Sequence, residues 1–447
     1  MGGELIMDIV DEDYVLLTQC CRVRDFTKKQ YMVLLDLCLR ANGLRNCAVD
    51  VACLSKASDG IHYREVNYFT VLGDVKEEYY DVYSGLQAHI ANNVIRKHVD
   101  SLNSYVALSN KKIDGKYDKP VYRPKKHDNR LENLIIPSQS ITSSKKKRAR
   151  GYIDLPLSRK YNNELESIDC RPRIKIPRNI RDKDLVQVEI IPVNNGEYFK
   201  AHFTYRERKK PLNLDKDKVM GIDLGVNNFA TIVTTEGTPR IVAGGYLKNL
   251  IYFRCKKVAH YQSLLNKQGL TSSKRLIKLN DGYYGRSGNF LNHAVKYIID
   301  TCIEQDVGTI VLGYNKDFQN KTNMGVKQNQ IFSHIAFKQF KTKLENKCRI
   351  HELDLIIQEE SYTSKSSFLD DDILPTYQPG QKKNHKYNFK GRRAKRGLYQ
   401  TQDGILINAD VNAAANIIKK SNQNFDYEEL SKRVQTTPIK IKNITQV

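Results

Sequence analysis

The rest of this chain is best interpreted from the segment Val219-Met220-Gly221-Ile222-Asp223-Leu224-Gly225-Val226-Asn227-Asn228. An apolar run ends in Asp223, which lies between two glycines, and a second apolar run from Phe229 to Val233 follows. This pattern predicts a buried strand, a tight turn and a second strand, with Asp223 fixed at the end of the first strand. The glycines would let another backbone, a metal or a phosphate come close. Such a carboxylate suits a metal-dependent nuclease, although a hairpin whose aspartate only caps the turn would show the same pattern.

The composition of the chain indicates a polyanionic partner. Its 447 residues include 73 lysines and arginines against 50 aspartates and glutamates, which gives a formal net charge of +23. This excess predicts binding to nucleic acid, with a membrane surface as the weaker alternative. No apolar run reaches the roughly 18 residues of a membrane-spanning helix, and the acidic N-terminal residues argue against a signal peptide. The 26 tyrosines provide rings that can stack on bases.

The cysteines bear on the cellular location. There are nine, an odd number, and they are scattered without a C-x-x-C pair, which predicts reduced thiols in a cytosol. The abundance of lysine, asparagine and isoleucine suggests an AT-rich genome and weakly favours a bacterial host over a viral or eukaryotic one. We therefore expect a cytoplasmic, nucleoid-associated protein of a prokaryotic host.

The N-terminal half predicts two kinds of structure. Residues 1–24 and 113–213 are strand-like, and their glycine and proline breaks indicate a β-barrel. Residues 25–112 follow helical spacing, which predicts a helical insert in that barrel. A basic run also occurs here, formed by Lys145, Lys146, Lys147, Arg148 and Arg150. Such a run is usually a solvated loop, but in a chain this basic we predict that it contacts phosphate.

From residue 214 the pattern becomes α/β. The predicted elements are strands at 219–223, 229–234 and 240–244, helix at 247–305 with a break near 282–285, a strand at 309–312, a helix at 329–348, a strand at 353–357, a strand at 405–408 and a helix at 411–420. Three antiparallel strands followed by alternating helix and strand is the plan of RNase H. We assign residues 214–364 and 404–420 to this domain, 365–403 to a basic insert, and 421–447 to a tail without a recognisable motif. The predicted fold class is therefore multi-domain α+β.

Three carboxylates are candidates for a metal site. Phosphodiester hydrolysis with two metals needs three or four carboxylates that converge on Mg²⁺, an ion that prefers hard oxygen ligands. Asp223, Glu360 and Asp410 each lie at a predicted strand end or helix start. Each also has a plainer interpretation, because Asp410 could cap its helix together with Asn408 and Glu360 could be a solvated strand end. Glu359 is an equally good ligand, but side chains alternate across a strand, so only one of the two glutamates can face the site.

Four segments taken together resemble a known family. They are GIDLGVNNFATIV at 221–233, EESYTSKSSFLD at 359–370, GRRAKRGLY at 391–399 and INADVNAAANII at 407–418. In this order they resemble the RuvC-type nuclease core of the TnpB family, transposon-encoded RNA-guided endonucleases that are similar to compact type V CRISPR effectors and to Fanzor proteins. The resemblance covers about residues 215–420. The N-terminal half fits only as architecture, a wedge-like barrel interrupted by a helical recognition insert.

The resemblance implies a mechanism, partners and a cofactor. A guide RNA would pair with one strand of a double-stranded DNA target, the protein would read a short motif in the adjacent duplex, and the RuvC site would cut the DNA. Asp223, Glu360 and Asp410 would hold two Mg²⁺ ions, which Mn²⁺ could replace. Two other functions stay open: a nuclease-dead RNA-guided DNA-binding protein, and a RuvC-like transposase or resolvase that needs no RNA. Actin-like ATPases and sugar kinases share the GIDLG signature, but here no second Asp-Gly-Gly hairpin follows.

The chain departs from the family at its second carboxylate. Members commonly carry a glutamate at the end of the strand that is here Ile310–Leu312, but this chain has Gly313 there and no carboxylate before Asp317. Some relatives look rearranged, with the glutamate supplied by the later strand. Glu360 fits that arrangement if the two strand ends are adjacent in the sheet.

The basic insert is the second departure. Many relatives carry two C-x-x-C pairs here, but this chain has none, with Ser366 and Ser367 near where the first would begin, so we expect no structural zinc. We predict instead that cations of this region clamp nucleic acid near the cut, with a disordered basic loop as the alternative. They are Lys365, Lys382, Lys383, Lys386, Lys390, Arg392, Arg393, Lys395 and Arg396.

Overall fold

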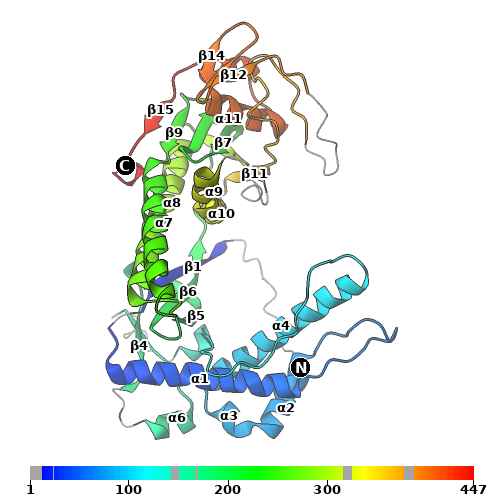
Figure 1. Ribbon diagram of the computed structural model, residues 1–447, viewed down its shortest axis with the longest axis vertical. Helices are drawn as coiled ribbons and strands as arrows, with labels where there is room; N and C mark the ends of the chain where they lie inside the picture. The colour runs from blue at the N-terminus through cyan, green and yellow to red at the C-terminus, as the bar shows by residue number, and fades with distance from the viewer. Residues whose placement is uncertain are drawn as a thin grey trace. The chain divides into compact units, whose positions relative to one another are not determined.

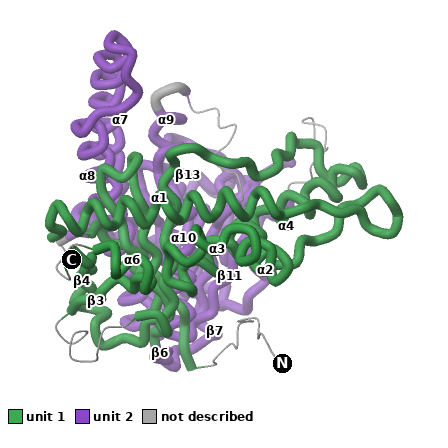
Figure 2. The backbone as a smooth tube through the Cα atoms, turned by 90° about the horizontal axis from the view of Figure 1, so that it is seen from below, with its two compact units in different colours: residues 1–207 green, residues 208–447 purple. Residues whose placement is uncertain are grey.

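The chain forms two compact units of mixed α and β structure, Met1–Glu207 and Arg208–Val447 (Figure 2). The computed structural model describes residues 13–23, 25–141, 151–165, 167, 170–315, 325–376 and 387–446. All nine cysteines fall within these ranges and are free thiols. Over the same ranges, no helix is both long enough and apolar enough to cross a membrane.

Helices dominate the first half of the N-terminal unit. They are α1 (Lys28–Val51), α2 (Tyr68–Glu78), α3 (Tyr80–Ser84) and α4 (Ala88–Ile113) (Figure 1). A capping box starts α1, because the Thr27 hydroxyl accepts from the Gln30 N–H and the Gln30 side chain accepts from the Thr27 N–H. Leu34 and Leu37 of α1 are buried in one core with Val94 of α4. These helices lie where the sequence predicts a helical insert, and its role in recognition stays a prediction.

The strands of the N-terminal unit form two sheets. In the larger sheet the order is β1 (Tyr14–Arg22), β6 (Tyr198–Arg208), β5 (Asp184–Val193) and β2 (Leu134–Pro137). The smaller sheet pairs β3 (Tyr152–Asp154) with β4 (Arg173–Lys175), and the short helix α6 (Arg159–Glu164) lies between them in sequence. Among the described residues β1 and β2 are the two edges of the larger sheet, so the predicted barrel is not confirmed. The basic run formed by Lys145, Lys146, Lys147, Arg148 and Arg150 lies outside the described residues.

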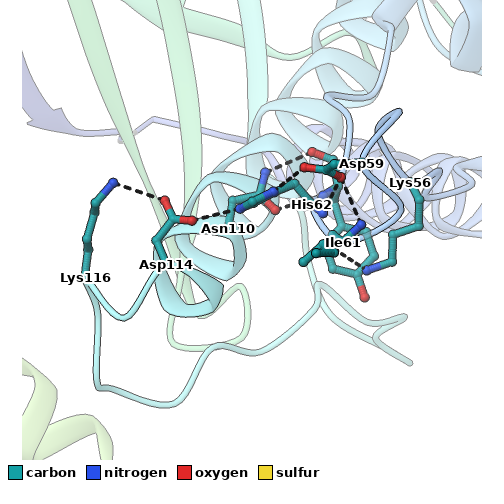
Figure 3. A network of polar contacts seen from close by, with 8 residues as sticks. Lys56, Asp59, Ile61, His62, Asn110, Asp114 and Lys116 are labelled. Atoms are coloured by element: carbon teal, nitrogen blue, oxygen red, sulfur yellow. Dashed lines mark hydrogen bonds and ion pairs between the residues drawn. The ribbon is translucent and has the colours of Figure 1, made fainter.

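Side chains at the C-terminal end of α4 bind the segment that precedes α2, which turns back on itself at the Lys56–Tyr63 bridge (Figure 3). The Asn110 amide accepts from the Tyr63 N–H and donates to the Tyr63 carbonyl, both at 2.9 Å. His62 lies between Asp59 and Asp114, with its ring nitrogens 2.5 and 2.8 Å from their carboxylates. Hydrogen bonds to these two carboxylates raise the pKa of His62. The segment is therefore fixed to α4 by polar contacts that depend in part on charge.

A six-stranded sheet forms the centre of the C-terminal unit. Its order is β11 (Asp354–Gln358), β10 (Val307–Gly313), β7 (Asp215–Leu224), β8 (Asn228–Thr234), β9 (Arg240–Ala243) and β15 (Ile439–Ile441). β7, β8 and β9 are antiparallel neighbours, whereas β10 runs parallel to β7 and β11 runs parallel to β10. The ends of β7, β10 and β11 therefore meet at one edge, which we call the carboxyl edge.

Helices cover both faces of this sheet. α7 (Gly245–Asn266), α8 (Lys274–Glu304) and α10 (Phe337–His351) pack with Ile222 and Phe229 on one face, with α9 (Val326–His334) beside them. α11 (Ala409–Lys420) and α12 (Tyr427–Val434) pack with Val219 and Val311 on the other. This division follows the alternation of side chains along each strand. Beside the main sheet, β12 (Arg392–Lys395), β13 (Leu398–Gln400) and β14 (Leu406–Asn408) form a small antiparallel sheet.

Two sequence predictions in this unit are wrong in detail. The predicted break at Gly282–Gly285 lies inside α8, and the chain instead leaves the helix between Asn266 and Lys274. Tyr283 is buried, donates to the His334 carbonyl at 2.9 Å and lies under the Arg254 guanidinium, and these contacts outweigh the roughly 1 kcal/mol that a helical glycine costs. The single helix predicted at 329–348 is divided between α9 and α10.

Candidate active site

The two glycines around Asp223 allow close approaches of different kinds. A Cβ atom at Gly221 would lie 2.4 Å from the Ala414 carbonyl oxygen of α11, so this glycine lets the α11 backbone lie directly on β7. A Cβ atom at Gly225 would lie 2.6 Å from the Asn228 carbonyl oxygen, which reflects the tight turn into β8. Asp223 is therefore the last residue but one of β7 at the carboxyl edge, beneath the helix that carries Asp410.

Asp410 lies in the first turn of α11 but does not cap it. The Asn408 side chain is the cap, since it accepts from the N–H groups of Asp410 at 3.0 Å and Val411 at 3.2 Å. The Asp410 carboxylate instead accepts from the Asn228 amide at 2.7 Å and lies 3.5 Å from the Arg393 guanidinium. The interpretation of Asp410 as a helix cap is therefore wrong, and its carboxylate faces the residues around Asp223.

The adjacent glutamates after β11 have different surroundings. Glu359 bonds to the Lys420 ammonium at 2.5 Å and accepts from the Ser361 N–H at 2.7 Å. The Glu360 N–H donates to the Asn315 side chain at 3.2 Å, and its Oε2 lies 3.2 Å from the place that a Cβ atom would take at Gly313. Gly313 ends β10 and pairs with Gln358 of β11. The two strand ends are thus neighbours, and the Glu360 carboxylate lies over the end of β10.

Asp223 and Glu360 both have raised pKa values. Burial, then the charges of Glu360 and Asp410, raise the pKa of Asp223 well above its usual range, and Arg393 opposes this shift. Burial, then the charge of Glu359, raises the pKa of Glu360 to about 7. All three residues remain partly exposed, so a solvated ion can reach them. A bound cation would stabilise the charged form of such carboxylates. Raised pKa values of this kind are common at functional sites.

The three carboxylates are suitable ligands for Mg²⁺, although they do not form a complete coordination sphere. Over the ranges that the structure describes, no three His, Cys, Asp or Glu side chains lie close enough together to hold a metal ion. The structure thus brings the three predicted ligands to one edge without assembling a closed coordination set. Hard carboxylate oxygens are the ligands that Mg²⁺ prefers. Arg393 supplies positive charge beside Asp410 in this arrangement.

The predicted nucleic-acid contacts of the insert are only partly described. Arg392, Arg393 and Lys395 lie exposed on β12, followed by exposed Arg396, and Lys365 is exposed nearer to Glu360 in sequence. Of these, only Arg393 is recorded in contact with a candidate carboxylate. Lys382, Lys383 and Lys386 lie outside the described residues.

Two residues with contacts in the site were missed in the sequence. Asn228 orients Asp410, and Lys420 bonds to Glu359. Asn228 begins β8 directly after the turn at Gly225, where polar residues are common, and Lys420 ends a helix, where lysine is common. No pattern in the sequence distinguishes them.

Comparisons with known proteins agree on one family. Residues 202–319 match the OrfB_IS605 model, described as a probable transposase, and residues 337–417 match the model of the Cas12f1-like TNB domain. TnpB-like protein ORF457 of Acidianus two-tailed virus is 22% identical over 375 residues, which cover 77% of this chain and 75% of that protein.

Two solved structures also match this chain at low sequence identity. A Cas12f1–sgRNA–target DNA complex gives a TM-score of 0.46 at 14% identity, covering 90% of this chain and 98% of that one. The mini-RNA-guided endonuclease CRISPR-Cas_phi3 gives a TM-score of 0.38 at 8% identity, covering 93% of this chain and 94% of that one.

Proposed function

Because the chain belongs to the TnpB family, we propose that it is an RNA-guided DNA endonuclease that cuts at the carboxyl edge of its C-terminal sheet. The observation that supports this most strongly is the position of Glu360. Its carboxylate lies over Gly313, at the strand end where relatives commonly carry their own glutamate, and its charge acts on Asp223. A site that has lost one carboxylate and regained another at the same strand end is better explained by an active nuclease than by a nuclease-dead one.

Asp223, Glu360 and Asp410 would hold the metal ions in this proposal. When bound, Mg²⁺ would activate the attacking water and stabilise the leaving oxygen. The chain's own residues prepare the site for this. Asn228 holds the Asp410 carboxylate at 2.7 Å, and Asn315 bonds to the backbone of Glu360. Since burial, and then repulsion by Glu360 and Asp410, raise the pKa of Asp223, a cation would favour its charged form.

The proposed partners are a guide RNA and a double-stranded DNA target. The net charge of +23 suits two polyanions. In this proposal the C-terminal unit is an RNase H-like RuvC domain, and the strands and helices of the N-terminal unit act as wedge and recognition domains. Exposed cations of the insert would contact phosphate near the cut: Lys365, Arg392, Arg393, Lys395 and Arg396.

The test is guided cleavage by the protein purified with its own RNA. A plasmid library would carry a target that matches the guide beside randomised flanks, and the reaction would contain Mg²⁺. We expect cuts that depend on the guide and disappear in Asp223→Ala, while RNA binding remains. Tight guided binding without cutting would identify a nuclease-dead binder. Cutting without RNA would identify a transposase or resolvase.

A further inference from the structure

We propose that Lys420 is a positioning residue that separates the roles of the two adjacent glutamates. It would hold Glu359 away from the carboxyl edge and so leave Glu360 as the one that faces Asp223. The inference rests on the proposed nuclease function, and it concerns how the substitute glutamate is selected rather than whether the chain cuts.

Lys420 is held in one place by three acceptors. Its ammonium lies 2.5 Å from the Glu359 carboxylate, 2.8 Å from the Ser361 carbonyl and 3.0 Å from the Pro375 carbonyl. A lysine has three N–H donors, so each can have a partner here. Only 6% of its side chain is exposed, which restricts other arrangements. A contact with this many partners fixes the position of Glu359 more firmly than an exposed ion pair would.

Both oxygens of Glu359 are occupied by these contacts. Oε2 bonds to Lys420, and Oε1 accepts from the Ser361 N–H at 2.7 Å. The carboxylate therefore turns back on its own loop. Without Lys420 the same carboxylate would be negative, partly buried and one residue away from Glu360, where it could compete for a cation.

The backbone of Glu360 is itself fixed from both sides. Its N–H donates to Asn315 at 3.2 Å, and its carbonyl accepts from the Thr363 hydroxyl at 2.9 Å. The anchored Glu359 precedes it directly. These contacts define the direction from which the Glu360 side chain reaches over Gly313.

One helix thereby governs two of the three proposed ligands. α11 carries Asp410 in its first turn and Lys420 as its last residue. It lies directly on β7, because Gly221 has no side chain to keep the two apart. The helix therefore places one carboxylate itself and directs a second through Lys420 and Glu359.

The neighbouring lysine provides a matched control. Lys419 also lies in the last turn of α11 and is 21% exposed, but its ammonium bonds to the Asp371 carboxylate at 2.5 Å and the Asp372 carbonyl at 2.8 Å. Lys419→Met removes the same charge from the same helix end without freeing Glu359.

The experiment compares Lys420→Met, Lys420→Arg, Lys419→Met and the double variant Glu359→Gln/Lys420→Met in guided cleavage under single-turnover conditions. The freed Glu359 carboxylate would compete with Glu360 for the cation and draw it out of place, and a displacement of about 1 Å costs on the order of 10²-fold in rate. We therefore expect Lys420→Met to cut about 100-fold more slowly and to need more Mg²⁺. Guided DNA binding should stay within about twofold of wild type. Lys420→Arg should restore part of the rate, and Lys419→Met should cut like wild type.

The double variant distinguishes positioning from a general loss of structure. Glutamine carries no charge to compete for the cation. Glu359→Gln/Lys420→Met should therefore cut at least tenfold faster than Lys420→Met and should need no more Mg²⁺ than wild type. A double variant as slow as Lys420→Met, or a Lys420→Met protein that cuts like wild type, would overturn the inference. If wild type itself makes no guided cut, the proposed function fails. If wild type cuts but the rate does not depend on Lys420 and Glu359 in this way, only the role of Lys420 is refuted.

Discussion

Gly221→Ala tests how closely α11 must lie on β7. The added Cβ atom would lie 2.4 Å from the Ala414 carbonyl oxygen and 2.6 Å from Cγ1 of Ile418. Ordinary van der Waals contact begins at 3.4 Å, so the α11 backbone must withdraw by about 1 Å (3.4 − 2.4). The isoleucine can change its side-chain conformation, but the carbonyl group belongs to the helix backbone and moves only with the helix.

This displacement has consequences for both stability and activity. Overpacking a core costs about 1–3 kcal/mol. In a unit of this size each kcal/mol lowers the melting temperature by about 2–4 °C. We therefore expect the melting temperature of the C-terminal unit to fall by about 2–12 °C. Because α11 also carries Asp410, a shift of about 1 Å should slow guided cleavage by about 100-fold.

The assay combines a thermal melt with single-turnover cleavage, and Gly285→Ala is the matched control. Gly285 lies within α8 of the same unit, and a Cβ atom there would meet nothing within 4 Å. The control should raise the melting temperature, since alanine favours a helix over glycine by about 1 kcal/mol, and leave cleavage unchanged. A Gly221→Ala protein that melts and cuts like wild type would show that α11 need not lie this close to β7.

Two further predictions concern single contacts. Gly313→Ala puts a Cβ atom 3.2 Å from Glu360 Oε2 and 2.4 Å from the end of the Ile417 side chain, so we expect guided cleavage to fall about tenfold, a cost of about 1.4 kcal/mol. Equal cleavage by the variant and wild type, at equal DNA binding, would contradict this. His62→Ala removes an imidazole whose pKa is raised by hydrogen bonds to Asp59 and Asp114. The charged imidazole stabilises the folded protein fully below its ordinary pKa of 6.5, and this stabilisation is lost as the pH rises through the raised pKa. The N-terminal transition of the variant should therefore lie below that of wild type at pH 6, and the gap should narrow by pH 8.5; a gap independent of pH would count against the charge effect.

The central strands could be predicted because their residues alternate or form short apolar runs. The sequence places β7, β8 and β9 within a few residues, and the buried runs that became β10 and β11 identify the strands whose ends meet. The positions of Asp223 and Asp410 at element ends follow from these patterns. Local signals were sufficient here because each candidate lies within a residue or two of a clear boundary.

The remaining features depend on partners distant in sequence. β15 is three residues long and joins the main sheet by pairing with β9, so no local alternation predicts it. The different surroundings of Glu359 and Glu360 depend on Lys420, about sixty residues later, and alternation along a strand could say only that one of the two glutamates faces the site. Contacts of this kind are settled by packing and not by local sequence.

The most direct test of the account is the rate of guided plasmid cleavage by Glu360→Gln and Glu359→Gln, measured beside wild type with equal loading of RNA. We expect that Glu360→Gln binds the target but makes no cut, and that Glu359→Gln still cuts at a rate close to wild type. Full cutting by Glu360→Gln together with loss in Glu359→Gln would contradict it, because the carboxylate that lies over Gly313 would then not be the one that the site uses.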